Sequence, residues 1–122
     1  MESVGIDLVE VERIRQVIER HGDRFVKRVF TDQEWMYCQR KKNCYLSLSA
    51  RFAAKEAVFK VLGTGWSHGV QWKDVEVLND DRGKPEIVLY GRAKELAGER
   101  KVLVSLTHTG EYAAAVAMLS ER

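Results

Sequence analysis

The stretch YLSLSARFAAKEAVFKVL, residues 45–62, decides the fold. Its apolar residues cover most of the girth of a helix: Ala50, Phe52, Ala53, Ala54, Ala57, Val58, Phe59, Val61 and Leu62. A helix that is apolar nearly all round is usually buried. The sequence Gly63-Thr64-Gly65 follows and is expected to stop the helix. We therefore expect a long buried helix with the rest of the chain packed around it.

The chain before this helix predicts a strand and then short helices. Val4–Val9 is a short apolar run and is expected to be a strand. The apolar spacing then becomes helical as far as Gly22, which should end that helix. Asp23–Phe30 is expected to form another short helix. Thr31 is an expected N-cap for a third, because Glu34 three positions later completes a capping box.

The chain after residue 69 shows an apolar period close to two, which is typical of strands. Two alternating segments flank the turn-forming residues 79–83 and predict a β-hairpin. A short helix over 91–97 and two strands, one through 102–106 and one over 112–119, should follow. The predicted fold class is α+β, with a mostly antiparallel sheet packed against the long helix.

Length and composition predict one soluble domain over residues 1–122. The chain is 45% apolar and 31% charged, and it has no apolar run near the roughly 20 residues that span a bilayer. Glu2 stands where a signal peptide needs basic charge, so a cytoplasmic location is expected and no membrane partner. Cys38 and Cys44, without a matching His/Cys pair, indicate reduced thiols rather than a zinc site.

Two carboxylates stand out from their apolar surroundings. Asp7 interrupts the first strand, where an unpaired carboxylate would be costly, although it could instead be a strand-end residue facing solvent. Glu56 lies on one helix face with Phe52, Phe59 and Lys60, and the simpler explanation is an i,i+4 ion pair with Lys60. If the two carboxylates meet, they form a hard oxygen site that suits Mg²⁺ and a diphosphate substrate, with Lys60 on the phosphoryl oxygens.

Two further features have both a functional and a structural explanation. His108 lies at a strand end beside hydroxyl residues and is as consistent with a structural role as with a functional one. Arg13 and Arg20, seven positions apart, share one helix face that Arg24 could extend. This basic stripe suits an acidic partner, although a solvated face is the more common explanation for such a stripe. No aromatic residues alternate with it, so a nucleic-acid partner is not expected.

Taken together, these segments resemble the holo-[acyl-carrier-protein] synthases, which are small 4′-phosphopantetheinyl transferases. The resemblance covers nearly the whole chain. The segments that carry it are Val4–Ile14, Arg24-Phe25, Phe30-Thr31, Glu34, Arg51–Ala57 with Lys60, Gly63-Thr64-Gly65, Gly83-Lys84-Pro85, Ser105–Thr109 and Tyr112–Ala115.

The resemblance implies roles for particular residues. Asp7 and Glu56 would be the Mg²⁺ ligands and, with Lys60, the catalytic residues. The residues implied to bind coenzyme A are Lys60, Gly63, Gly65, Gly83, Lys84, Pro85 and His108. The residues implied to dock an acidic acyl carrier protein are Arg13, Arg20, Arg24 and Phe25.

The implied reaction moves the phosphopantetheine arm of coenzyme A onto a carrier serine, in support of fatty acid biosynthesis. The resemblance also implies a homotrimer with active sites between subunits. Three rivals remain at this point: a non-catalytic module that binds the carrier or coenzyme A, a Mg²⁺-dependent hydrolase of the coenzyme A diphosphate, and a nucleic-acid-binding domain.

Overall fold

The computed structural model describes residues 3–63 and 69–121. The elements of its N-terminal half are β1 (Ser3–Glu10), α1 (Val11–His21), α2 (Asp23–Val29), α3 (Asp32–Gln39) and α4 (Cys44–Leu62). Those of the C-terminal half are a 3₁₀ helix η1 (Trp72–Asp74), β2 (Val75–Asn79), β3 (Pro85–Leu89), α5 (Gly91–Ala97), β4 (Val102–His108) and β5 (Tyr112–Leu119). The α+β prediction is confirmed, and so is the long helix.

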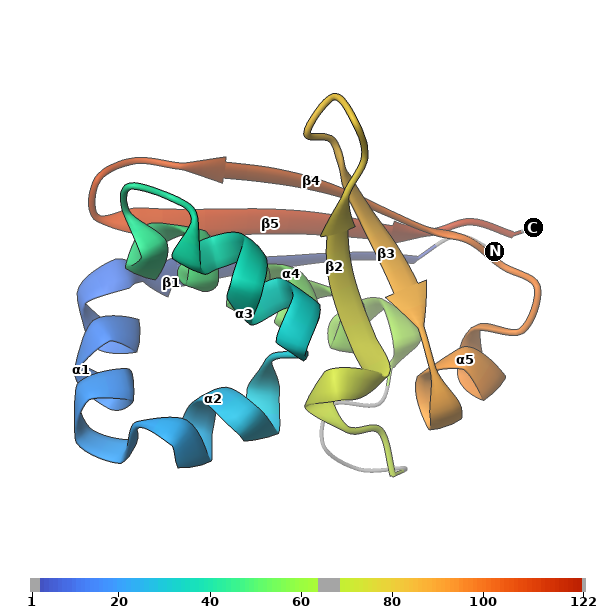
Figure 1. The fold of residues 1–122 in the computed structure, drawn as a ribbon. Helices are drawn as coiled ribbons and strands as arrows, with labels where there is room; N and C mark the ends of the chain where they lie inside the picture. The colour runs from blue at the N-terminus through green and yellow to red at the C-terminus, as the bar shows by residue number, and fades with distance from the viewer. Residues whose placement is uncertain (1–2, 64–68, 122) are drawn as a thin grey trace.

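The strands form two antiparallel sheets rather than one. β1, β5 and β4 make a three-stranded sheet in that order, and β2 pairs with β3 as the predicted hairpin. The helices lie on one side of the three-stranded sheet, with the hairpin standing across one end (Figure 1). Strand pairing between distant segments has no local sequence signal, which is why the division into two sheets was not predicted.

Small residues allow α4 to lie close against β1 and β5. Ala53 and Ala57 of α4 are fully buried, and Ala115 and Ala117 of β5 are at most 1% exposed. Gly5 on β1 is buried too. With so few side-chain atoms between them, the helix and strand backbones approach closely, and the larger core residues gather around this contact.

The alternation along the sheet leaves its other face exposed and apolar. Val4, Ile6 and Leu8 of β1 are 63–67% exposed. They are joined on this face by Leu103 of β4 and by Val116 and Met118 of β5. Val4 pairs with Met118 and Ile6 with Val116, so the exposed side chains form rows across the sheet. We call these six residues the outer sheet face.

The helix ends follow the predicted signals. Thr31 caps α3, with its side chain accepting from the Glu34 backbone while Glu34 accepts from the Thr31 backbone, as a capping box requires. Gly63 ends α4 in the left-handed region at φ 74°, where glycine has no steric penalty. None of the described helices is long and apolar enough to cross a membrane.

A buried ion pair ties α4 to the neighbouring elements. Lys55 and Glu34 are both fully buried, with Nζ of Lys55 2.8 Å from Oε1 of Glu34. Lys55 also donates to the carbonyls of Trp72 and Val75, and Glu34 accepts from the backbone N–H of Val77 at 2.7 Å. Burial lowers the pKa of Lys55, and the charge of Glu34 opposes that shift. The pair therefore fixes the rotation of α4 about its axis.

Removing either charge should destabilise the fold strongly. We expect Glu34→Gln to cost about 3–5 kcal/mol, because it leaves the Lys55 cation buried without its partner. Lys55→Met should also lower the free energy of unfolding. The double variant should lose clearly less of this free energy than the two single variants lose when added together. Urea unfolding of all three variants tests this as a double-mutant cycle, and strictly additive losses would show that the two charges are not coupled.

Candidate functional site

Asp7 points from β1 towards α4 instead of into solvent. It lies in the middle of the strand, its side chain is 12% exposed, and its Oδ1 is 3.2 Å from Nζ of Lys60. Its other oxygen, Oδ2, is buried and has no hydrogen-bond partner. Lys60 also donates to the backbone carbonyl of Ile6 at 2.7 Å. The alternative of a solvent-facing strand-end aspartate does not fit this placement.

Glu56 stands beside this pair, one helical turn before Lys60, and is only partly exposed. Burial raises the pKa of the Glu56 carboxyl, the negative charge of Asp7 raises it further, and the Lys60 cation opposes both. The two carboxylates are therefore close enough to repel each other. The ion pair that Lys60 makes is with Asp7, and not the local i,i+4 pair with Glu56.

This arrangement suits a hard divalent cation. Two carboxylates converge, one buried oxygen lacks a partner, and burial and the charge of Asp7 both raise the pKa of Glu56. No group of three or more potential ligand side chains occurs in the described part of the chain. One or two carboxylates completed by water and substrate phosphates is the usual protein site for Mg²⁺. Asp7 and Glu56 could hold such an ion.

A hollow of about 550 Å³ opens beside Glu56. It is lined by Glu56 and Phe52 of α4, by Arg13 of α1, by Phe25 of α2 and by the start of β5 at Tyr112, among others. Most of the residues that line it are apolar, and the charged ones are Arg13, Glu10 and Glu56. The structure thus brings two of the predicted docking residues, Arg13 and Phe25, to the hollow beside Glu56.

The other two predicted docking residues lie further out. Arg20 lines a small hollow of about 200 Å³ on α1 together with Arg13. Arg24 is exposed at the start of α2 and lines neither hollow. The basic stripe therefore runs from the hollow beside Glu56 outwards along α1.

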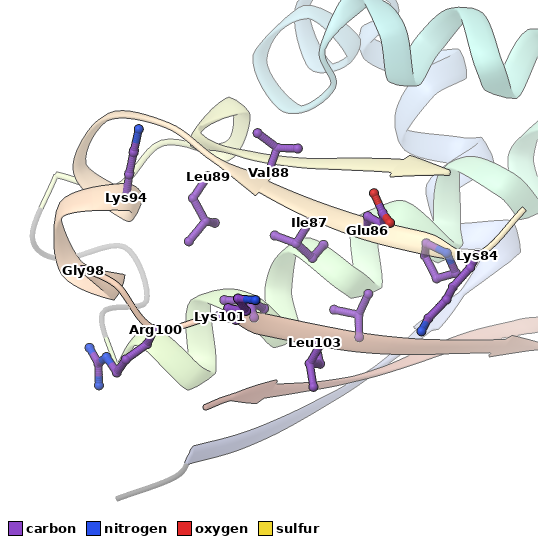
Figure 2. A pocket seen from close by; sticks show the side chains of 13 residues that line it. Lys84, Glu86, Ile87, Val88, Leu89, Lys94, Gly98, Arg100, Lys101 and Leu103 are labelled. Carbon is purple, nitrogen blue, oxygen red and sulfur yellow. The ribbon is translucent and has the colours of Figure 1, made fainter. Parts of the chain in front are cut away.

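The predicted coenzyme A residues divide into two groups in space. Lys60 lies at the carboxylate pair, and Gly63 ends α4 nearly one turn beyond it. Lys84 and Pro85, in contrast, line a hollow of about 640 Å³ between β3 and β4 that includes neither carboxylate. Lys84 lies at one end of this hollow, with Lys94 and Arg100 at the other (Figure 2).

His108 is exposed at the end of β4 and pairs with Ala113 of β5. Val9 of β1 pairs with the same Ala113 on the opposite edge of β5. His108 is therefore separated from Val9 by the width of two strand spacings, about 10 Å. Gly83 has φ 84° in the hairpin turn, where Oδ1 of Asp80 accepts from the backbone N–H groups of Arg82 and Lys84. Within one chain, these residues are not brought to Asp7 and Glu56. Gly65 lies outside the described residues.

Two residues at the site and one buried arginine elsewhere on α4 have no role in the sequence-based prediction. Phe52 and Tyr112 line the hollow beside Glu56. Arg51 is 3% exposed, donates to Ser47 and Asn79, and lies 4.2 Å from the ring centroid of Tyr37, while its Nε lacks a partner. An arginine inside an otherwise apolar helix was the available signal for Arg51.

Comparison with known proteins gives a consistent family. A family model described as the 4′-phosphopantetheinyl transferase superfamily matches residues 3–117. The holo-[acyl-carrier-protein] synthase of Solibacter usitatus is 49% identical over 110 residues, covering 88% of each chain. That of Chlamydia trachomatis serovar D is 48% identical over 118 residues, covering 97% of this chain and 98% of the relative.

Solved structures agree with this family. The Helicobacter pylori holo-[acyl-carrier-protein] synthase in complex with coenzyme A has a TM-score of 0.86 at 26% identity, covering 96% of this chain and 99% of that one. The Bacillus anthracis enzyme in complex with CoA (3′,5′-ADP) has a TM-score of 0.80 at 34% identity, covering 96% and 94%. The chain therefore belongs to the 4′-phosphopantetheinyl transferase superfamily and, within it, to the holo-[acyl-carrier-protein] synthases.

Proposed function

We propose that the chain transfers 4′-phosphopantetheine from coenzyme A to a serine of an apo-acyl carrier protein. The products are the holo-carrier and adenosine 3′,5′-bisphosphate. The observation that carries this proposal is the pair of converging carboxylates, Asp7 and Glu56, with Lys60 beside them. Such a set suits a diphosphate substrate, and the family's coenzyme A complexes support that choice. The reaction belongs to fatty acid biosynthesis and is expected in the cytoplasm.

Asp7 and Glu56 would hold Mg²⁺, and the unpartnered Oδ2 of Asp7 is the observation that fits this assignment. When bound, the ion supplies positive charge that neutralises the diphosphate oxygens and stabilises the leaving group. Lys60 would donate a hydrogen bond to a phosphate oxygen of coenzyme A, exchanging its contact with Asp7 for the substrate.

The group transfer itself is a displacement at phosphorus. The carrier serine Oγ forms a bond to the β-phosphorus of coenzyme A, which carries the pantetheine arm, and the bond to the oxygen of the adenosine bisphosphate breaks. The serine proton would pass to Glu56, the carboxylate that lines the hollow where the carrier serine would enter. Lys60 stabilises the negative charge that the leaving bisphosphate takes away.

The basic stripe would dock the carrier. Arg13 and Phe25 line the hollow beside Glu56, so an acidic carrier helix held there would present its serine to the carboxylate pair. Arg20 and Arg24, which lie further out, would extend this contact through charge that is exposed and therefore weaker.

Two observations support a homotrimer with sites between subunits. The outer sheet face exposes six apolar side chains on adjacent strands, more than a monomer usually leaves bare. The turn at Gly83-Lys84-Pro85 and His108 lie away from the carboxylate pair of their own chain, and a neighbouring chain could bring its copy to the site. The coenzyme would then bridge two chains.

The reaction can be tested by intact mass spectrometry of an apo-acyl carrier protein incubated with the chain, coenzyme A and Mg²⁺. We expect a mass gain of one phosphopantetheine that EDTA abolishes. Asp7→Asn and Glu56→Gln should each slow transfer by about 100-fold or more while remaining folded, and the exposed Asp32→Asn should keep the wild-type rate.

Other outcomes of the same experiment would exclude the proposal. No gain with coenzyme A intact would favour a binding module, and no gain with coenzyme A consumed would favour a hydrolase. A wild-type rate for Asp7→Asn at saturating Mg²⁺ would show that Asp7 is not a metal ligand.

The docking assignment predicts a change in the carrier KM alone. Arg13→Glu should raise the KM for the carrier by about tenfold, because the reversed charge repels an acidic helix, and should leave the KM for coenzyme A unchanged. Lys73→Glu, an exposed charge reversal on η1, is the matched control and should change neither value. An unchanged carrier KM for Arg13→Glu would remove Arg13 from the docking surface.

The assembly prediction concerns the outer sheet face. Leu103 is 56% exposed, and Leu103→Asp should turn the trimer into a monomer because it places a charge in an apolar interface. Light scattering coupled to size exclusion measures the mass. Met36→Asp replaces an exposed apolar residue on α3 and should leave the mass unchanged. A wild-type mass for Leu103→Asp would locate the interface elsewhere.

A further inference from the structure

Gly5 marks a very close approach between β1 and α4. A Cβ built on Gly5 would lie 2.6 Å from the backbone carbonyl oxygen of Ala57, 2.9 Å from Cβ of Lys60 and 3.2 Å from Cγ1 of Val61. The first of these atoms belongs to the helix backbone and cannot swing aside as a flexible side chain would. Any side chain at residue 5 therefore has to push the strand and the helix apart.

This contact lies directly beside the carboxylate pair. Asp7 is two residues after Gly5, on the same face of β1. Glu56 immediately precedes Ala57 on α4, and Lys60 both contacts the Gly5 position and bonds to Asp7. The spacing of β1 and α4 at Gly5 therefore sets the spacing of the two backbones from which Asp7 and Glu56 project.

We propose that Gly5 is a positioning residue that sets the separation of the Asp7 and Glu56 carboxylates and thereby selects the size of the divalent cation between them. This inference rests on the proposed function. Mg²⁺ requires ligand oxygens at about 2.0–2.1 Å in a rigid octahedron, whereas Ca²⁺ accepts about 2.3–2.6 Å in flexible geometry. A glycine at residue 5 keeps the two backbones close enough for the smaller, more demanding ion.

The size of the expected displacement supports this assignment. In Gly5→Ala the new methyl group must move from 2.6 Å to ordinary contact at 3.4 Å or more from the Ala57 oxygen, a change of about 0.8 Å. The difference between Mg²⁺ and Ca²⁺ ligand distances is smaller, about 0.2–0.6 Å for each ligand. The displacement is therefore large enough to spoil the smaller site while leaving room for the larger ion.

The metal preference can be measured without turnover. Binding of Mn²⁺ to the protein, alone and with coenzyme A, is followed by the loss of the free Mn²⁺ electron paramagnetic resonance signal, and Mg²⁺ and Ca²⁺ are titrated as competitors. The readout is the ratio of the Mg²⁺ to the Ca²⁺ concentration that displaces half of the Mn²⁺. In Gly5→Ala we expect this ratio to rise by about tenfold or more relative to the wild type.

A matched control separates cation size from general damage. Ala117 pairs with Gly5 across β1 and β5 and is fully buried, so Ala117→Gly perturbs the same level of the core without driving β1 from α4. It should lower the melting temperature and leave the ratio unchanged. If Gly5→Ala does not fold, Gly5→Ala/Val61→Ala removes the side-chain contact at 3.2 Å, keeps the backbone contact and carries the same expectation.

The outcomes distinguish this inference from the proposed function. An unchanged ratio in a folded Gly5 variant, with Mg²⁺-dependent transfer intact in the wild type, overturns the role of Gly5 alone. The same shift of the ratio in Ala117→Gly would also overturn it, because the effect would then come from lost stability. A wild-type chain that binds none of the three ions and transfers nothing overturns the proposed function itself.

Discussion

The close packing of α4 against β1 and β5 is the constraint on which the rest of the structure depends. Alanines on the helix meet glycine and alanines on the strands, so the backbones themselves are nearly in contact. A contact between backbones is stiff, because it has no rotamers to adjust. Glu34 and Lys55 hold the helix from its opposite side, so both its rotation and its distance from the sheet are fixed. Side chains at the edge of this contact are therefore attached to backbone that moves little.

Asp7, Glu56 and Lys60 are the side chains at that edge, and in the free protein their charges are poorly balanced. Lys60 satisfies one oxygen of Asp7 and leaves the other unpartnered, while the pKa of Glu56 is raised by burial and by its neighbour. Carboxylates held together in this way weaken the folded state unless a cation joins them. The site is therefore preorganised for positive charge, and the rigid contact beside it prevents the carboxylates from relaxing apart.

Local signals in the sequence predicted the elements well, because each rests on neighbouring residues. The apolar girth of residues 45–62, the Thr31–Glu34 capping box and the turn before Lys84 all have local causes, and the structure contains all three.

Signals that depend on distant partners were weaker. The division into two sheets went unseen, and Lys60 bonds to Asp7, which is 53 residues away, rather than to Glu56 one turn away. Glycine inside a strand was the available signal for Gly5, but its cause, the Ala57 carbonyl, lies on another element.

The alternation of β1 links the proposed metal site to the proposed assembly. Its odd positions, Gly5 and Asp7, face α4, and its even positions, Val4, Ile6 and Leu8, form part of the outer sheet face. One strand thus carries ligand and interface on opposite sides, and a shift of register by one residue would exchange them. Pairing with β5 over the whole of β1 holds that register. Burying the outer sheet face in an oligomer would stabilise the same strand pairing, so assembly and preorganisation of the carboxylates would reinforce each other.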